Sequence, residues 1–411
     1  TGYYDKNNNS FQAFEILALK MGWKKILVLT FKPAVENAWE QDLLTHTDFE
    51  GWEFISKSNA TKKKIKTKKP IVCFGSFQDF LGKNKAGGIK PKNEWVHTIN
   101  WDCVVLDEYH YGAWRENARE LVGIEGKAEA KFAGGEGIDY FDEELMPITT
   151  NAYLYLSGTP FRALETGEFI ESQIFNWTYS DEQEAKNKWR GKDNPYKSMP
   201  RVVMMTYQLP KSIINILEKK GEFDEFDLNQ FFQAKGQNKN AYFEYEDEVQ
   251  KWLDWIRGSL KENEYDDLIK GKRKPLFPFK FSKLKSNLNH TLWFLPSVAS
   301  CYAMKNLLEQ RQNIFYRDFS INVAAGTKAG IGVNALPPVL KSMENPLYSK
   351  TITLTCGKLT QGVSVKPWSG IFMLRNTTSP ETYFQSAFRV QTPWTLKNEN
   401  GNDFNEETVL K

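Results

Sequence analysis

The fold is decided by one stretch of sequence, Val104-Val105-Leu106-Asp107-Glu108-Tyr109-His110. A continuous apolar run leads directly into two carboxylates, and a histidine follows two residues after the second. Such a run is typical of a strand buried on both faces of a parallel sheet. Ligands of open parallel sheets bind at the carboxyl ends of the strands, so we expect Asp107 and Glu108 to lie at a functional site. The alternative is an ordinary acidic loop after a buried strand.

Similar apolar runs lie on both sides of this stretch. They occupy residues 25–30, 71–74 and 153–156 in the first half, and residues 291–295 and 370–374 in the second. Residues 351–355 are also predicted to form a strand. Between many of these runs the apolar residues have helical spacing. Strands that alternate with helices predict βαβ units, and therefore parallel sheets.

The middle of the chain has a different pattern. Residues 212–218 and 244–257 have the apolar spacing of helices. We therefore predict an α/β fold with two parallel-sheet lobes and a helical insertion. The expected domains are a first lobe at 1–200, the insertion and linker at 201–289, and a second lobe at 290–411. The insertion also carries four aromatic residues that we expect in a core, with base stacking as the alternative: Trp252, Trp255, Phe277 and Phe279.

The composition excludes several classes of protein. Of the 411 residues, 41% are hydrophobic and 26% are charged, which is typical of globular domains. No apolar run approaches the ~18 residues that span a bilayer, so a membrane protein is excluded. The 4 cysteines and 4 histidines have no metal-ligand or CxxC spacing, which argues against a zinc site or a disulfide scaffold and predicts a reducing, cytoplasmic compartment. The net charge of +3 permits a nucleic-acid partner.

A second polar turn follows another strand. Ser157-Gly158-Thr159-Pro160 comes directly after the run at 153–156. Small hydroxylated residues and glycine allow a tight turn, and its polar groups are expected to contact His110 and the neighbouring strand end. Taken alone, this segment would be interpreted as an ordinary turn before a helix.

Together, these segments resemble the superfamily-two DExH-box helicases and translocases. The sequences of its motif segments most resemble those of helicase subunits of restriction systems and of phage-encoded helicases. Residues 107–110 match the DExH box, and residues 157–160 match the S/T-A/G-T-P motif. Four further segments are similar to motif Ia, to the next strand-end motif, to motif V and to motif VI of the family: residues 30–33, 74–78, 360–365 and 383–391.

This resemblance implies two RecA-like lobes with ATP and Mg²⁺ in the cleft between them. It implies a nucleic-acid helicase or translocase motor, with DNA favoured over RNA, and nuclease or methyltransferase domains or subunits as partners. Asp107 and Ser10 would hold Mg²⁺, and Glu108 would polarise the attacking water. The other expected catalytic residues are His110, Gln385 and Arg389. Gly362 and Ser364 would contact the cofactor, and the expected nucleic-acid contacts are Thr30, Lys32, Pro33, Ser76 and Thr360.

The chain departs from the family at its start. The phosphate loop G-x-x-x-x-G-K-[ST] is not visible before the first helix. Ser10 stands where the Mg²⁺-binding hydroxyl belongs, but Asn9 stands where the lysine belongs. Three explanations remain open: the loop is missing and its flanks are joined, the start is non-native, or the site is degenerate. Both ends look cut, so we expect a piece of a longer protein. In the other motifs, Thr392 stands in place of a second arginine and Ser364 in place of an acid.

Two other functions compete with a motor. A degenerate phosphate loop would leave a catalytically inactive scaffold that only binds nucleic acid. A P-loop ATPase acting on proteins is the third hypothesis, and the segments that resemble motifs Ia and V argue against it.

A lysine-rich run precedes the strand at 71–74. Seven lysines fall between Lys57 and Lys69 with no acid among them. A solvated loop is one interpretation. The other is a loop that contacts phosphates, because neutralisation of the backbone dominates nonspecific affinity. On that interpretation the expected contacts include Lys62, Lys63 and Lys64.

Overall fold

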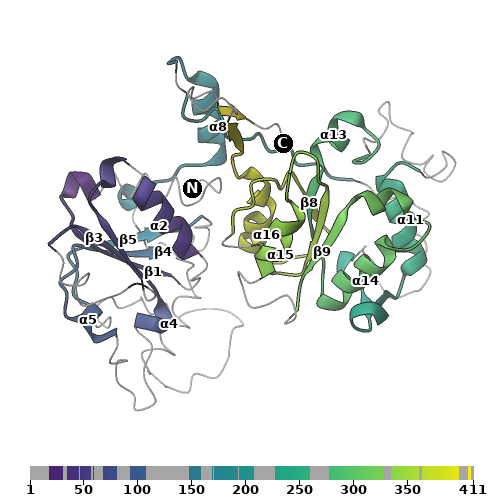
Figure 1. Cartoon of the computed structure of the whole chain (residues 1–411), viewed down its shortest axis with the longest axis horizontal. Coiled ribbons are helices and arrows are strands. Elements are labelled where there is room, and N and C mark those ends of the chain that lie inside the picture. Colours follow the sequence, from purple (N-terminus) through teal and green to yellow (C-terminus); the bar gives the residue numbers. More distant parts are fainter. Residues whose placement is uncertain are drawn as a thin grey trace, which may run out of the picture. The chain divides into compact units, whose positions relative to one another are not determined.

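The computed structural model describes residues 18–30, 35–45, 47–56, 59, 68–80, 93–107, 148–158, 169, 171–192, 194–207, 227–259, 277–326, 335–360, 363–397 and 406–408. The chain divides into two compact units, of which the first ends at Glu182 and the second begins at Gln183. Each unit contains one parallel sheet (Figure 1). The predicted α/β class with two parallel-sheet lobes is therefore confirmed, consistent with two RecA-like lobes. The finer boundaries at 200 and 289 stay a prediction.

The first unit is built on a five-stranded parallel sheet. Its order is β2-β3-β1-β4-β5, with β1 at the centre. The strands are β1 (Lys25–Thr30), β2 (Glu53–Ser56), β3 (Ile71–Ser76), β4 (Cys103–Asp107) and β5 (Tyr153–Leu156). The helical segments include α2 (Glu36–Thr45), η2 (Thr47–Phe49), α4 (Phe77–Phe80) and α5 (Glu94–His97). Residues 18–21 are also helical.

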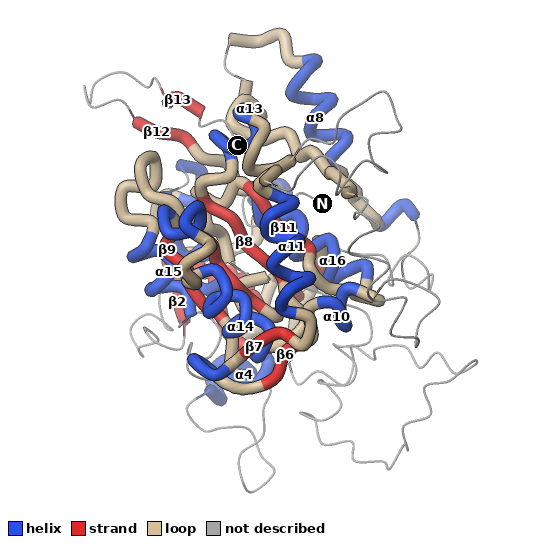
Figure 2. The backbone as a smooth tube through the Cα atoms, turned by 90° about the vertical axis from the view of Figure 1, so that its right-hand side faces the viewer, coloured by secondary structure: helices blue, strands red, loops and turns tan. Residues whose placement is uncertain are grey.

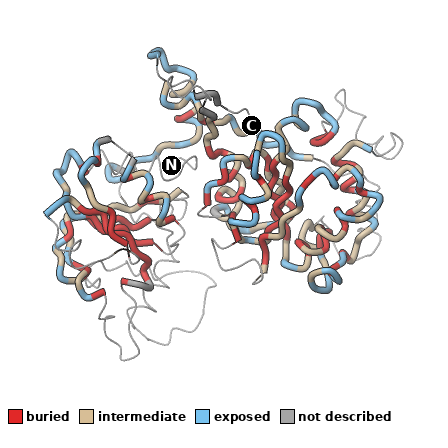
Figure 3. Tube along the Cα trace, viewed as in Figure 1, coloured by how far each residue is buried: buried red, intermediate tan, exposed pale blue. Residues whose placement is uncertain are grey.

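Both faces of the first sheet are buried, as its continuous apolar strands predict. Leu27 and Leu29 of β1 belong to the apolar cluster on one face, and Ile26 and Val28 belong to the cluster on the other. Successive side chains of a strand point to opposite faces, so an uninterrupted apolar run is what a doubly covered sheet requires. The central strands are accordingly buried in Figure 3.

The second unit is built on a four-stranded parallel sheet of order β11-β8-β10-β9. The strands are β8 (His290–Phe294), β9 (Ser320–Ala324), β10 (Thr351–Thr355) and β11 (Gly370–Met373). Its helical segments include α13 (Ser282–Asn287), α14 (Val298–Leu308), η8 (Ile314–Asp318), α15 (Leu336–Ser342), α16 (Pro380–Ala387) and η11 (Phe388–Gln391). Ser297 caps α14 by accepting a hydrogen bond from the backbone N–H of Ser300, at 3.0 Å.

The predicted insertion contributes to the core of the second unit. Its elements include α10 (Leu228–Phe231), α11 (Glu246–Ile256) and a short hairpin of β6 (Ala234–Lys235) and β7 (Tyr242–Phe243). Figure 2 shows this hairpin beside α14, and the residues of the two elements are in contact. Apolar residues on α11 recur every three or four positions, and the Trp252 ring meets the Trp293 ring of β8 edge-on at 5.7 Å.

The core interpretation of the four insertion aromatics is confirmed. All four are buried in the same apolar cluster as β8, α14 and β10. The segment that holds them therefore packs as part of the second unit.

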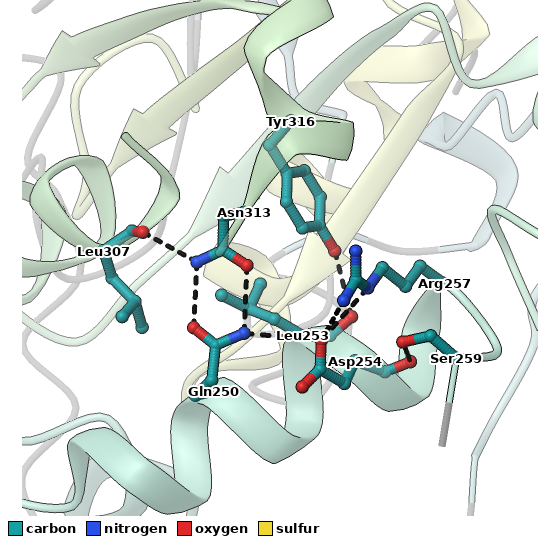
Figure 4. Close-up of polar contacts among 8 residues, drawn as sticks. All are labelled: Gln250, Leu253, Asp254, Arg257, Ser259, Leu307, Asn313 and Tyr316. Carbon is teal, nitrogen blue, oxygen red and sulfur yellow. Dashed lines mark hydrogen bonds and ion pairs between the residues drawn. The ribbon is translucent and has the colours of Figure 1, made fainter. Parts of the chain in front are cut away.

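A network of polar contacts fastens α11 to the segment after α14 (Figure 4). The amides of Gln250 and Asn313 exchange two hydrogen bonds, at 2.9 and 2.8 Å. The Asn313 amide also donates to the carbonyl of Leu307, and the Tyr316 hydroxyl donates to the carbonyl of Leu253. Burial disfavours the charged form of a phenol, and the pKa of the buried Tyr316 is raised for this reason. These bonds fix the orientation of α11, because a rotation would leave the amides of Gln250 and Asn313 unpaired.

Two further elements complete the described chain. Helix α8 (Tyr179–Lys188) starts at a cap in which the Asp181 carboxylate accepts hydrogen bonds from the backbone and hydroxyl of Thr178. Strands β12 (Thr395–Lys397) and β13 (Glu406–Thr408) form an antiparallel pair. Across the described ranges, none of the helices has the length and apolar character needed to cross a membrane.

Candidate functional site

The candidate site begins at the carboxyl edge of the first sheet. The register places Thr30 opposite Ser76 on one side and opposite Asp107 on the other. Each of these residues ends its strand, and their exposed fractions are 0%, 5% and 2%. The structure therefore brings together two residues expected to contact nucleic acid and one expected to hold Mg²⁺.

Asp107 is a buried carboxylate with a partner that the sequence did not reveal. The indole N–H of Trp39, on α2, donates to Oδ2 of Asp107 at 3.3 Å. A buried polar group is costly unless it is hydrogen-bonded, so this contact offsets part of the cost of burying the Asp107 side chain. Trp39 could have been suspected, because α2 begins six residues after the end of β1, the strand beside β4.

The oxygen donors at this edge suit a hard cation. The carboxylate of Asp107 lies among the hydroxyl-bearing strand ends of Thr30 and Ser76, and Mg²⁺ prefers oxygen ligands. Within the described part of the chain, no three His, Cys, Asp or Glu side chains gather into a metal-binding group. The donors present thus fit a Mg²⁺ ion that is held by one carboxylate and other oxygens.

The turn after β5 lies next to Asp107. Leu156, the last residue of β5, is the register partner of Asp107, so Ser157 and Gly158 follow beside the same strand end. This is the neighbourhood that the sequence predicts for the second polar turn.

Several expected site residues lie outside the described residues. They are Ser10, Lys32, Pro33, Lys62, Lys63, Lys64, Glu108, His110 and Gly362. Their roles stay predictions.

Gln385 and Arg389 form a buried pair in the second unit. Gln385 lies on α16 and Arg389 in η11, with exposed fractions of 2% and 6%. Nε of Arg389 donates to the carbonyl of Gln385 at 2.9 Å, and Nη1 donates to the carbonyl of Val363 at 2.7 Å. The guanidinium thereby connects the segment that resembles motif VI to the one that resembles motif V. Whether it also reaches a phosphate stays a prediction.

Thr360 and Ser364 differ in their surroundings. Thr360 is buried, and its hydroxyl donates to the carbonyl of Gly357 at 2.7 Å. Ser364 is exposed. The predicted nucleic-acid contact of Thr360 and the predicted cofactor contact of Ser364 are not decided by these positions.

The carboxyl edge of the second sheet carries cations that sequence reasoning missed. The Arg375 guanidinium lies 5.1 Å from the centre of the Phe294 ring, and Nη1 donates to the carbonyl of Cys356 at 3.4 Å. Lys358 donates to the carbonyl of Gly326. Both residues follow strands closely, β11 and β10, so the rule that ligands bind at strand ends was the signal that could have found them.

Comparison with known proteins gives one curated relative. The chain is 30% identical, over 416 aligned positions, to a protein of Mycoplasma pneumoniae described as "Putative type II restriction enzyme and methyltransferase RM.MpnORF110P C-terminus". The match covers 93% of this chain but only 56% of that protein, so the chain spans little more than half of its length. No protein-family model matches the chain.

Among solved structures, the chain is similar to a Sulfolobus solfataricus SWI2/SNF2 ATPase core in complex with dsDNA. The identity is 10%, and the match covers 90% of this chain and 75% of that one. The TM-score is 0.27, which is too low for the likeness to carry an argument.

Proposed function

We propose that the chain is an ATP-dependent motor that moves on DNA, of the helicase or translocase type. The observation that carries this proposal is the side-by-side placement of Thr30, Ser76 and Asp107. A motor must couple the group that senses the nucleotide to the groups that grip the track. Adjacent ends of hydrogen-bonded strands offer such coupling, because a displacement of one strand end is transmitted to the next.

Each residue has a defined task in this proposal. Asp107 would hold Mg²⁺, and the bound ion would neutralise charge on the phosphates of ATP. Glu108, the next residue, would accept the proton of the attacking water. Arg389 would offer a planar guanidinium to the transferring phosphoryl group while Gln385 and Val363 keep it in place.

The relative's printed description supports DNA as the track. A restriction enzyme acts on DNA, and that protein is also described as a methyltransferase. We therefore propose nuclease and methyltransferase domains or subunits as the partners of this chain.

A catalytically inactive nucleic-acid scaffold is the second candidate. It is favoured by Asn9, which stands where the phosphate-loop lysine belongs. A chain that cannot hold the β- and γ-phosphates would keep its grip on nucleic acid and lose its turnover.

One pair of measurements separates the two candidates. Binding of ATP to the purified chain is titrated to find its stoichiometry, and hydrolysis is followed with and without duplex DNA. The motor predicts one ATP per chain and hydrolysis that DNA stimulates. Glu108→Gln should keep ATP binding and reduce turnover ~10²-fold or more. DNA binding without ATP binding would overturn the motor and leave the scaffold.

A further inference from the structure

Two cysteines that are distant in the sequence meet in the second unit. Cys301 lies on α14 and is fully buried, whereas Cys356 directly follows β10 and is partly exposed. Helix α14 packs against β10, and Cys356 packs against the apolar cluster that contains Cys301. The two thiols lie within hydrogen-bonding reach of each other. One of the two residues is thus partly exposed, and its neighbour is enclosed in the core.

The surroundings of Cys356 favour its thiolate. The hydrogen bond from Cys301, with the charges of Arg375 and Lys358 as further causes, lowers the pKa of Cys356 to about 7. The pKa of Cys301 is raised well above its usual value, chiefly by burial, so Cys301 keeps its proton and is the donor. A thiolate next to cations and partly open to solvent is the pattern of a reactive cysteine.

The first unit supplies a contrast. Cys73 and Cys103 are both buried in its sheet. Burial raises the pKa of Cys73 well above its usual value and, with the nearby charge of Asp102, raises the pKa of Cys103 to about 12. The same chain therefore contains two thiols that should be inert and one that should react.

We propose that Cys356 and Cys301 are a redox-active thiol pair, which small-molecule disulfides convert into an intramolecular disulfide. The Cys356 thiolate attacks one sulfur of the reagent, an S–S bond forms, and the other half of the reagent leaves as a thiolate. Cys301 then loses its proton and attacks the Cys356 sulfur, which expels the second thiolate. The two cysteines lose two electrons, the reagent gains them, and the two thiol protons end on the released thiols.

The position of the pair gives the reaction a structural effect. Cys356 begins a turn that hydrogen bonds hold together: Thr355 Oγ1 accepts from the backbone N–H of Gly357, and Thr360 donates to the Gly357 carbonyl. Leu359 in this turn has a φ of 62°, in the left-handed region that non-glycine residues rarely adopt. A disulfide would tie the start of this constrained turn to α14.

The test uses the folded chain and oxidised glutathione. After incubation, free thiols are alkylated and the digested protein is examined by mass spectrometry. We expect a peptide pair joined through Cys301 and Cys356, its loss on reduction, and full alkylation of Cys73 and Cys103 only after unfolding.

Two variants make the order of steps visible. Cys301→Ser removes the resolving thiol, so a glutathione adduct should accumulate on Cys356. Cys356→Ala should abolish both the adduct and the disulfide, while the matched control Cys103→Ser should behave like the unaltered chain. Failure of the unaltered chain to form the disulfide, or reaction of Cys73 and Cys103 at the rate of Cys356, would overturn the proposal. Because the readout is a covalent bond, it is independent of whether the chain hydrolyses ATP.

Discussion

The first sheet ends at Thr30, Ser76 and Asp107, whereas the second ends among Cys356, Lys358 and Arg375. Both sheets are parallel and both bury their central strands, so the difference lies in the few residues at the strand ends. One edge carries carboxylate and hydroxyl oxygens, and the other carries two cations and a thiol. The architecture determines where a site lies, and the residues at the strand ends determine its chemistry.

The largest expected effect comes from removing the negative charge at the first edge. Asp107→Asn keeps the shape of the side chain and an oxygen that can accept from Trp39. Because a bound metal ion supplies several kcal/mol of charge stabilisation, ATP hydrolysis should fall by ~10²-fold or more. Steady-state hydrolysis in the presence of duplex DNA measures this loss.

The matched control is Asp318→Asn, the same change on an exposed carboxylate of the second unit whose side chain is 73% exposed. It should leave hydrolysis unchanged. If Asp107→Asn also hydrolyses ATP at the original rate, the first edge is not a cation site, and the proposed chemical difference between the two sheet edges is wrong.

The reactivity of Cys356 should depend on pH in a way that no thiol of the first sheet shares. Its pKa is lowered to about 7 by the hydrogen bond from Cys301 and by the charges of Arg375 and Lys358. Alkylation by iodoacetamide should therefore level off above that pH and fall roughly tenfold for each unit below it, since only the thiolate reacts. Rates for each cysteine follow from peptide mass spectrometry. A rate that keeps rising through pH 9 would show an ordinary thiol.

A smaller effect is expected from neutralising the cations of the second edge. The double substitution Arg375→Gln with Lys358→Gln should weaken DNA binding several-fold, evenly across sequences. The slope of log K against log salt should shrink by nearly one unit for each DNA phosphate that the protein no longer neutralises. Fluorescence anisotropy at a series of salt concentrations gives both values.

Lys239→Gln serves as the control for this pair, because Lys239 is an exposed lysine of the second unit away from the sheet edge. It should leave the slope as it is. An equal reduction of the slope in the control would mean that the second edge has no special part in binding.

The smallest effect concerns the opposite end of the second sheet. His290 begins β8, and its Nε2 donates to the carbonyl of Pro346 at 2.7 Å, which leaves Nδ1 to accept from the Thr351 hydroxyl at 2.9 Å. Burial lowers the pKa of this imidazole below 6.5. In acid the unfolded chain therefore binds the proton first.

The sign of the pH effect follows from this order. The contribution of His290 to the free energy of unfolding is complete above pH 6.5. It is lost as the pH falls towards the lower folded-state pKa, by at most ~1.4 kcal/mol per pH unit. Urea unfolding of the second unit at several pH values measures the slope, and His290→Asn should flatten it. An unchanged slope in that variant would assign the acid sensitivity to other groups.

The strands were the most predictable part of the fold. The strands β1, β5 and β10 were predicted at their observed bounds: β1 and β5 carry apolar runs, and β10 alternates threonine with Ile352 and Leu354. The edge strands β2 and β9 were missed, since Glu53-Phe54-Ile55-Ser56 and Ser320-Ile321-Asn322-Val323-Ala324 are mixed in polarity. Polar residues flank or interrupt the apolar ones in both strands, so a search for apolar runs does not separate these strands from loops.

For the candidate site, the sequence predicted the positions of residues along the chain but not their contacts in space. The position of Asp107 after a buried strand could be inferred, but its contact with Trp39 joins residues 68 positions apart. The Cys301–Cys356 pair was overlooked for the same reason, because spacing in the sequence does not indicate which helix packs on which strand. Contacts between elements are decided by packing, which a local pattern does not encode.

The packing of α11 into the second unit also affects how the chain folds during its synthesis on the ribosome. Trp252 and Leu253 leave the ribosome on the order of a hundred residues before Ile352 and Leu354 of β10, which share their core. At ~5–20 residues per second, these apolar side chains wait on the order of ten seconds for their partners. The second unit must therefore complete its core late in synthesis, and the apolar side chains of α10 and α11 lack their β10 partners in the interval.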